Sequence, residues 1–227
     1  PLSLTPAGKT YHRGLTDILG RYYELENEVI TAGTTLRGTL HVAAIYSVGL
    51  SYMPEAKEEF ARLYPDVDVR VDYGRNEAVL DDVVSGRADL GLVSFPRSNK
   101  QIIAVPWQRE PMRLVCSPKH RLAKCTEVTA DDLDGIEMVG FDRSLELRRM
   151  IDHTLKRVGI RVDFRTELDN ADSIVRAIEA DKGIGFLPEA AVRRETAIGT
   201  LRVVACRALS MNRPLGIVFR RSGGPSR

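Results

Sequence analysis

Polar side chains follow the predicted strands of this chain directly, in positions where they can bind a small anion. Ser47 follows a strand predicted at 39–45, and Arg75 and Asn76 follow a strand predicted at 66–73. Serine hydroxyl, amide and guanidinium groups donate hydrogen bonds to carboxylates, sulfates and phosphates, and arginine can do so in a bidentate manner. These residue types therefore predict noncovalent binding of an anionic small molecule.

Residues of similar character follow the other predicted strands, and together they make up the candidate binding site. The candidate binding residues are Ser47, Val48, Arg75, Asn76, Ser94, Phe95, Phe141, Asp142, Arg143 and Asn170. Some of them have a competing structural interpretation. Arg75 can be a solvated surface side chain, since guanidinium groups usually lie outside, and Asp142 and Arg143 can pair with each other across a loop.

The start of the helix after the first strand has two interpretations. Ser51 is the better N-cap on residue preferences, because Pro54 then falls in the first turn, where no N–H is needed. A start near Ser47 would instead place free N–H groups beside the Ser47 hydroxyl, where both can bind an anion. Ser47 is predicted as a contact in either case, with a purely capping role as the alternative.

Motifs of enzymes and metal sites are missing from the sequence. The four histidines form no HExxH or other paired-ligand spacing, and neither GxSxG nor GxxxxGK[ST] occurs. Three cysteines are too few and too widely spaced for a disulfide framework or a CxxC pair, which favours a reducing compartment. Cys116 lies in an apolar strand and is predicted to be a core residue. We expect no enzyme activity, no cofactor and no metal.

Charge and hydropathy restrict the partners of this segment. Basic and acidic side chains number 33 and 31 and are spread along the chain, so no basic arm is available to neutralise a run of phosphates. No apolar run has the length of a membrane span, and no signal-peptide pattern occurs at the start. These features predict no membrane partner, a cytoplasmic location and no DNA binding by this segment alone. The start at Pro1, without methionine, suggests that another domain precedes it.

The candidate residues are positioned by two similar units of alternating strands and helices. The first unit consists of strands at 39–45, 66–73 and 88–93 with helices at 52–63 and 77–85 between them. The second consists of strands at 136–141, 162–168 and 184–187 with helices at 145–158 and 173–180. This order predicts an α/β fold with two Rossmann-like lobes, in which the carboxyl ends of parallel strands share one edge.

Segments between and after the two units give the chain two opportunities to pass from one lobe to the other. The first is formed by 102–105 and 112–117, and the second by 211–214 and the last strand, 215–220. We therefore expect one lobe over 37–118 and 209–227 and a second over 119–208. Two facing strand edges would enclose a cleft for a ligand.

A helix with a heptad pattern is predicted before the first lobe, within residues 1–36. Thr5 can cap it, and Pro6 occupies a position that needs no N–H. Its apolar stripe consists of Tyr11, Leu15, Ile18, Tyr22, Leu25 and Val29. Spacings of three and four residues favour packing against a second helix, although such a stripe can also lie on its own domain.

Several short motifs occur in an order and spacing that resembles the LysR-type transcription regulators of bacteria. They are Leu4-Thr5-Pro6-Ala7-Gly8, Gly38-Thr39-Leu40-His41-Val42, Tyr64-Pro65, Gly86-Arg87-Ala88-Asp89-Leu90-Gly91 and Gly183-Ile184-Gly185-Phe186-Leu187-Pro188. The first resembles the end of the winged-helix domain of that family, and the second resembles the strand that opens its first sensing lobe. The resemblance extends from the first residues to about Arg221.

The resemblance implies a type 2 periplasmic-binding-protein-like fold, preceded by a linker helix, that senses a small-molecule effector. It also implies a homodimer or homotetramer that contacts DNA only through the domain upstream of this chain. The helix at Ser47 would start near that residue with the proline inside it, and Arg75 would occupy a position that faces the effector. A periplasmic-type solute-binding protein and a small transferase have the same architecture. The heptad helix and the absence of an export signal or catalytic motif argue against both.

Overall fold

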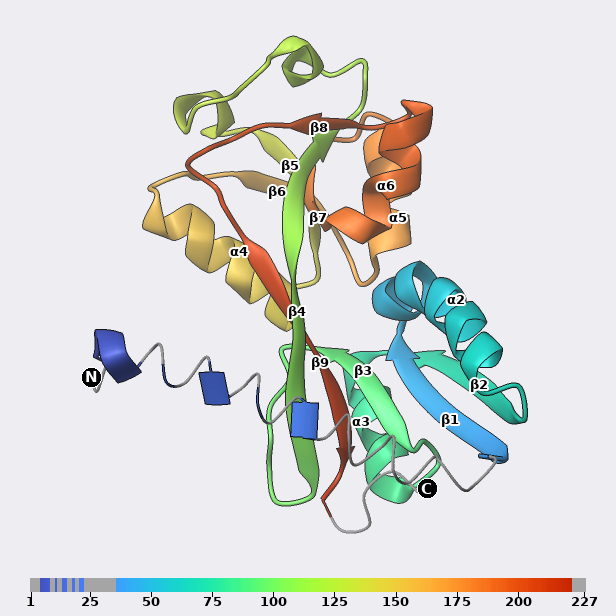
Figure 1. Cartoon of the computed structure of the whole chain (residues 1–227). Helices are drawn as coiled ribbons and strands as arrows, with labels where there is room; N and C mark the ends of the chain where they lie inside the picture. The colour runs from blue at the N-terminus through green and yellow to red at the C-terminus, as the bar shows by residue number, and fades with distance from the viewer. Residues whose placement is uncertain are drawn as a thin grey trace.

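Two lobes with separate hydrophobic cores make up the protein, and two long strands join them (Figure 1). The structure is a computed structural model that describes residues 5–8, 11, 14, 15, 18, 21, 22 and 36–221. Lobe I is the lobe whose core includes Val48, Val83 and Val218, and lobe II is the lobe whose core includes Ile174 and Leu187. The expected two-lobed α/β architecture is confirmed.

Lobe I contains the first predicted β-α-β-α-β unit. Its elements are β1 (Gly38–Ile45), α2 (Tyr46–Leu63), β2 (Val67–Gly74), α3 (Asn76–Ser85) and β3 (Leu90–Ser94). Strand β1 pairs in parallel with both β2 and β3, so the carboxyl ends of these three strands lie at one edge of the sheet. Ser47, Arg75 and Ser94 are placed near that edge.

Lobe II repeats the arrangement and adds one helix. Its elements are β5 (Glu137–Phe141), α4 (Glu146–Arg157), β6 (Asp163–Leu168), α5 (Ala171–Glu179), β7 (Gly185–Pro188), α6 (Glu189–Ile198) and β8 (Arg202–Val204), with short 3₁₀ turns at Arg121–Lys124 and Asp131–Leu133. Strands β5 and β6 are parallel, and an isolated parallel bridge between Met138 and Ile184 links β5 to the start of β7.

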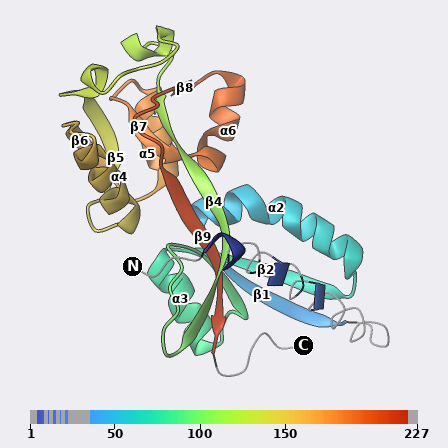
Figure 2. The same cartoon turned by 60° about the vertical axis from the view of Figure 1, so that its left-hand side comes forward.

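Strands β4 (Ile102–Cys116) and β9 (Asn212–Arg220) pass from one lobe to the other, side by side and antiparallel (Figures 1 and 2). In lobe I, β9 also pairs with β3, and in lobe II, β4 also pairs with β7 and β8. The result is one seven-stranded sheet in the order β2-β1-β3-β9-β4-β7, with β8 beside β4. The two predicted crossings are confirmed, but antiparallel pairing makes the sheet mixed instead of parallel.

Two local expectations were wrong, and one helix was not expected. Helix α2 begins at Tyr46 and contains Pro54, so Ser51 lies inside the helix and is not its N-cap. Packing explains the early start: a Cβ atom on Gly49 would lie 2.4 Å from the ring of Tyr73, so only glycine lets this turn lie against β2. The segments predicted at 102–105 and 112–117 are one strand, and helix α6 was not predicted.

The described residues of the N-terminal segment agree with the predicted helix. The Thr5 hydroxyl accepts a hydrogen bond of 3.1 Å from the N–H of Gly8, as expected of an N-cap. Tyr11, Leu15 and Ile18 are helical and exposed, as is Tyr22. Leu25 and Val29, the last two residues of the stripe, lie outside the described residues.

Candidate functional site

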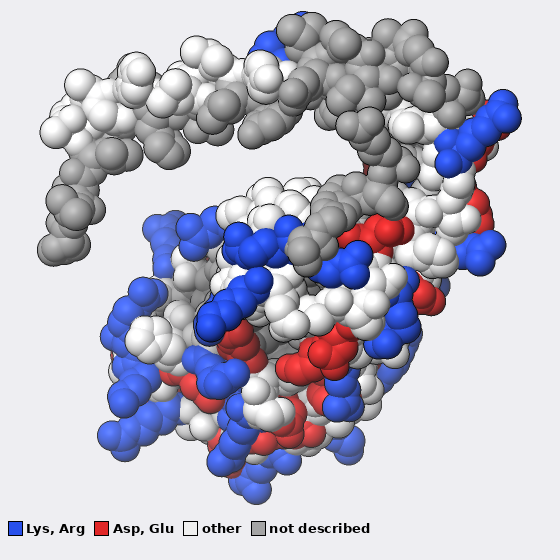
Figure 3. All heavy atoms as spheres, turned by 90° about the horizontal axis from the view of Figure 1, so that it is seen from below, with Lys and Arg blue, Asp and Glu red and all other residues white. Residues whose placement is uncertain are grey.

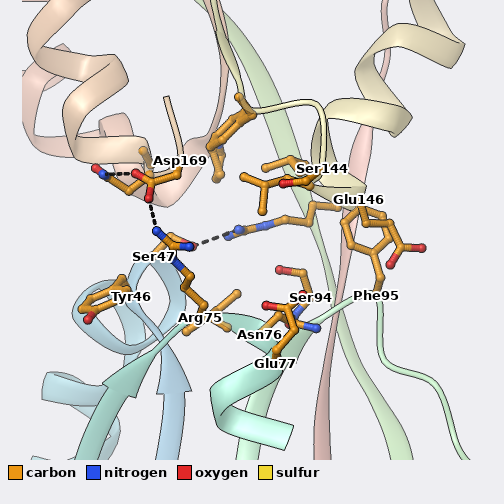
Figure 4. A pocket seen from close by; sticks show the side chains of 18 of the residues that line it. Tyr46, Ser47, Arg75, Asn76, Glu77, Ser94, Phe95, Ser144, Glu146 and Asp169 are labelled. Carbon is orange, nitrogen blue, oxygen red and sulfur yellow. Dashed lines mark hydrogen bonds and ion pairs between the residues drawn. The ribbon is translucent and has the colours of Figure 1, made fainter. Parts of the chain in front are cut away.

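A cavity of about 180 Å³ lies between the two lobes, at the carboxyl ends of the strands (Figure 4). Its volume is below the several hundred Å³ typical of pockets for drug-sized ligands, so it suits a small metabolite. The cavity is lined by Ile45, Tyr46, Ser47, Gly74, Arg75, Asn76, Glu77, Ser94, Phe95, Phe141, Ser144, Leu145, Glu146, Leu147, Arg149, Asp169, Asn170, Ala171, Pro188 and Arg213.

Five helices begin at this cavity. The residues that precede α2, α3, α4, α5 and α6 all line it, and they are Ile45, Arg75, Leu145, Asn170 and Pro188. The first turn of a helix carries unsatisfied N–H groups and the positive end of the helix dipole. Such a terminus favours negative charge nearby unless an acidic side chain or a cap already compensates it.

Helix α2 differs from the other four in its first turn. The first turns of α3, α4, α5 and α6 each contain an acidic residue, and the first turn of α2 contains none. No side chain caps the N-terminus of α2 either. Its N–H groups therefore have no carboxylate of their own helix to compensate them. The interpretation of Ser47 as only a helix cap does not fit this geometry.

Ser47 is held by an arginine on the second crossing strand. Nη1 of Arg213 donates a hydrogen bond of 2.9 Å to the Ser47 hydroxyl oxygen (Figure 4). The same guanidinium group donates through Nε, at 3.0 Å, and through Nη2 to one carboxylate oxygen of Glu110. The side chains of Arg213 and Glu110 are 3% and 1% exposed, so this is a fully buried ion pair.

The Glu110–Arg213 pair lies where β4 and β9 pass between the lobes, because these two residues face each other in the strand register. The second carboxylate oxygen of Glu110 accepts hydrogen bonds of 3.2 Å from the Tyr52 hydroxyl of α2 and the Ala190 N–H of α6. Burial, followed by the Glu110 charge, raises the pKa of Tyr52. Glu110 thus connects an element of lobe I to an element of lobe II.

Two ion pairs cross the cavity from lobe I to lobe II. Arg75 contacts the carboxylate of Asp169, and Arg97 contacts that of Glu146. Both arginines are mostly exposed, so each pair contributes little to the free energy of unfolding. Arg75 is therefore largely exposed, as its surface interpretation expects, and its charge is compensated by Asp169 at the cavity.

Phe95 adopts an unusual backbone conformation at the cavity. Its φ angle of 52° lies in the left-handed region, which costs a non-glycine residue roughly 1–3 kcal/mol. The Phe95 N–H donates a hydrogen bond of 2.8 Å to the carbonyl oxygen of Pro214 on β9. This hydrogen bond fixes the residue after β3 against β9. Phe95 and Ser94 both line the cavity.

Seven of the ten candidate residues line the cavity: Ser47, Arg75, Asn76, Ser94, Phe95, Phe141 and Asn170. Val48 belongs to the core of lobe I and is fully buried. Asp142 and Arg143 lie outside the lining, and they do not pair with each other. Asp142 accepts hydrogen bonds from the hydroxyl and N–H of Ser144, which lower the pKa of Asp142, while Arg143 donates to Glu167 at 2.9 Å.

The sequence interpretation missed two arginines of the lining. Arg213 lies within β9, so it does not follow a strand end. Arg149 lies in the first turns of α4 and donates only a long hydrogen bond, 3.4 Å, to the carbonyl oxygen of Ser144. Among the described residues Arg149 has no carboxylate partner, which makes it the lining arginine best placed to compensate an anion.

Cys116 is a core residue, as predicted. Its side chain is fully buried, and burial raises the pKa of the thiol to about 11. At neutral pH the group is therefore a thiol, which is a poor nucleophile and metal ligand. In the part of the chain that the structure describes, no three His, Cys, Asp or Glu side chains come together as a metal site.

The face of the molecule seen in Figure 3 carries basic and acidic side chains side by side, in agreement with the balanced charge of the sequence. Mixed charge of this kind differs from the continuous basic surface that a run of DNA phosphates attracts. Within the described residues, no helix combines the length and the hydropathy needed to cross a membrane.

Comparisons with known proteins agree with the two-lobed architecture. The chain is 21% identical over 214 residues to the HTH-type transcriptional regulator CysL of Bacillus subtilis, covering 94% of this chain and 72% of that protein. It superimposes on the CcmR regulatory domain of Synechocystis PCC6803 in complex with 2-PG, with a TM-score of 0.73, 20% identity, and coverage of 84% of this chain and 91% of that one.

A second solved structure, the effector binding domain of QuiR in complex with shikimate, has the same TM-score and the same coverage at 19% identity. At this identity the likeness shows the fold. A family model described as the LysR substrate binding domain matches residues 33–227, which include both lobes and the whole cavity. The chain therefore belongs to the LysR substrate-binding domain family.

Proposed function

We propose that this chain is the effector-sensing part of a transcription regulator and that it binds a small anion in the cavity between its lobes. The observation that carries the proposal is the N-terminus of α2, which no acidic side chain of its own first turn compensates and which lies beside the Ser47 hydroxyl at the cavity. Helix N-termini and hydroxyl donors together bind anions without a metal. The similar domains of CcmR and QuiR were solved with 2-PG and shikimate, which supports a small-molecule ligand here.

The formal charges of the lining cancel, but one of its arginines, Arg149, has no carboxylate partner among the described residues. Three arginines and three acidic residues line the cavity. Arg213 is compensated by Glu110 and Arg75 by Asp169, whereas Arg149 has no carboxylate partner among the described residues. An incoming anion would take up this charge and the donors of α2. The candidate residues Asp142 and Arg143 would then not contact the ligand; Asp142 accepts a hydrogen bond from Ser144, and Arg143 pairs with Glu167.

The rest of the proposal concerns the whole regulator. We take residues 37–118 and 209–227 as lobe I together with both crossing strands, 119–208 as lobe II, and 1–36 as the end of a DNA-binding domain with its linker helix. The apolar residues within 112–116 of the first crossing and 209–211 before the second pack in the core of lobe II. DNA would be contacted only by the domain upstream, in the cytoplasm, and the chain would catalyse no reaction. The relatives' names as transcription regulators support this division of roles.

A screen of small metabolites tests the proposed function. Thermal unfolding of the purified chain should shift upward with at least one carboxylate or phosphate ester, because a ligand that binds only the folded state stabilises it. Arg149→Ala should weaken binding of that compound about two- to fivefold, as expected for an exposed charge. Arg143→Ala is the matched control, since Arg143 is paired with Glu167 outside the cavity, and it should leave the affinity unchanged. Equal loss in both variants would contradict the assignment of Arg149.

Assembly is a separate prediction of the proposed function. Leu15 and Ile18 are 41% and 65% exposed, and burial against a second copy of the helix would remove this apolar area from water. Leu15→Asp with Ile18→Asp should therefore lower the oligomeric state of the full-length regulator in sedimentation experiments. Val203→Asp, at an apolar residue 49% exposed in lobe II, serves as the control. A strictly monomeric unmodified chain at tens of micromolar would argue against the helix as an oligomerisation element.

A further inference from the structure

We propose that the ligand is a hydroxylated anion, whose anionic oxygens contact lobe I and whose hydroxyl group donates to Ser144 of lobe II. The inference rests on the proposed function and names the chemistry of its ligand. It follows from the hydrogen bonds that the lining residues already make, because these bonds decide which groups remain donors and which remain acceptors.

Ser47 is a donor toward the cavity. A serine hydroxyl has one hydrogen to donate and two lone pairs to accept with, whereas a guanidinium group can only donate. Nη1 of Arg213 therefore occupies a lone pair of the Ser47 oxygen, at 2.9 Å, and leaves the hydroxyl hydrogen for another partner. The ion pair with Glu110 keeps Arg213 buried and fixed in place. An acceptor atom of a ligand completes this arrangement.

Asn76 presents donors for the same kind of reason. Its side-chain oxygen accepts a hydrogen bond of 3.2 Å from the N–H of Ser94. That bond assigns the oxygen to β3 and leaves the NH₂ group, with its two hydrogens, as the remaining polar group of the side chain. Asn76, Ser47 and the first turn of α2 together give lobe I a wall of donors (Figure 4).

Ser144 on lobe II has the opposite character. Its hydroxyl donates to a carboxylate oxygen of Asp142 at 2.5 Å, so its hydrogen is already used. This bond and the N–H of Ser144 lower the pKa of Asp142, which keeps the carboxylate ionised and able to accept. The Ser144 oxygen therefore has lone pairs available at the cavity, where the carboxylates of Glu146 and Asp169 also accept.

The two walls together favour a ligand with hydrogen-bond acceptors at one end and a hydroxyl donor at the other. An anionic group satisfies the donors of lobe I, and Arg149 adds charge from the other wall. A ligand without a hydroxyl or other donor would leave the Ser144 oxygen to water, because Ser144 is exposed. A hydroxyl group on the ligand replaces that water by one direct hydrogen bond, which predicts a modest preference, about two- to tenfold. This is the physical basis for expecting a hydroxy acid instead of a plain carboxylate.

Matched pairs of acids test the inference by calorimetry on the intact chain. We would compare malate with succinate, and shikimate with cyclohex-1-enecarboxylate, which differ in their hydroxyl groups. The hydroxylated member of at least one pair should bind about two- to tenfold more tightly than its partner. Ser144→Ala should remove most of that preference, whereas Ser47→Ala should weaken both members by a similar factor, roughly ten- to hundredfold for a hydrogen bond to a charged group.

Ser85→Ala is the matched control, because the exposed Ser85 hydroxyl bonds only to a local carbonyl outside the cavity. Equal affinity for both members of every pair, or a Ser144→Ala variant that keeps the preference, would overturn the inference. Binding of plain carboxylates or phosphates with no preference for a hydroxyl group would overturn it while leaving the proposed function intact. Failure of every compound in the wider metabolite screen would contradict both.

Discussion

Glu110→Leu should destabilise the protein by about 3–5 kcal/mol, because it leaves the guanidinium group of Arg213 buried without a counter-charge. Arg213 is 3% exposed at its side chain, and Glu110 is its only carboxylate partner among the described residues. The substitution also removes the acceptor of the Tyr52 hydroxyl and of the Ala190 N–H. The free energy of unfolding, measured by urea denaturation, reports this loss.

The double variant Glu110→Leu with Arg213→Met should recover most of that stability. Replacing both members of a buried ion pair with apolar side chains of similar size is often neutral or stabilising. Asp68→Ala, which breaks the exposed pair with Arg70, is the control and should cost at most about 1 kcal/mol. A Glu110→Leu variant as stable as the unmodified protein would contradict the account of the pair.

Most of the fold could be predicted from local pattern. Runs of β-branched residues and helical stretches repeat with nearly the same spacing in both halves, and parallel units of this kind have few alternative arrangements. The strand ends then placed Ser47, Arg75 and Ser94 correctly at one edge. These features depend on residues close together in the chain, which is why the sequence alone indicated them.

The start of α2 depends on tertiary packing, and this is why residue preferences gave the wrong position. Pro54 removes the N–H that would bond to the carbonyl of Leu50, so a helix through this residue has a local cost. Contact between the turn at Gly49 and the ring of Tyr73 stabilises the helix nonetheless. Tyr73 lies on strand β2, and nothing in the sequence near Pro54 indicates that this ring packs against helix α2.

Strand β4 shows a second limit of local pattern. Pro106 and Pro111 lie between the two predicted segments and lack the N–H group that a strand ladder needs. In the structure β4 remains paired with β9 through both prolines, and the register shifts between Pro106 and Gln108. The irregular pairing of β4 with β9 therefore accommodates two residues that have no N–H group to donate.

The arginines of the site show the limit of the sequence most clearly. Arg213 is separated from Glu110 by 103 residues and from Ser47 by 166, so only the assembled fold brings them together. In α4, Arg148 is buried over the ring of Phe164, at 3.6 Å, while its neighbour Arg149 lines the cavity. Adjacent residues of the same type have different roles because successive side chains of a helix point in different directions.

The central claim is that an anion binds between the lobes at Ser47 and Arg75, and one affinity measurement tests it most directly. The tightest compound from the metabolite screen would be titrated by calorimetry into the unmodified chain and into the Ser47→Ala, Arg75→Ala double variant. Loss of the Ser47 hydrogen bond to a charged group, about 1.5 kcal/mol, and of the exposed Arg75 charge, at most about 1 kcal/mol, predicts affinity lower by roughly ten- to seventyfold. Arg75→Ala also leaves the Asp169 carboxylate to repel the anion.

The control is the Ser85→Ala, Arg143→Ala double variant, which removes the same two residue types outside the cavity and should bind the compound as the unmodified chain does. A loss of at least about tenfold confined to the Ser47→Ala, Arg75→Ala variant is the result that the account predicts. Unchanged affinity in that variant would contradict it, because the ligand would then bind somewhere other than the donor wall of lobe I.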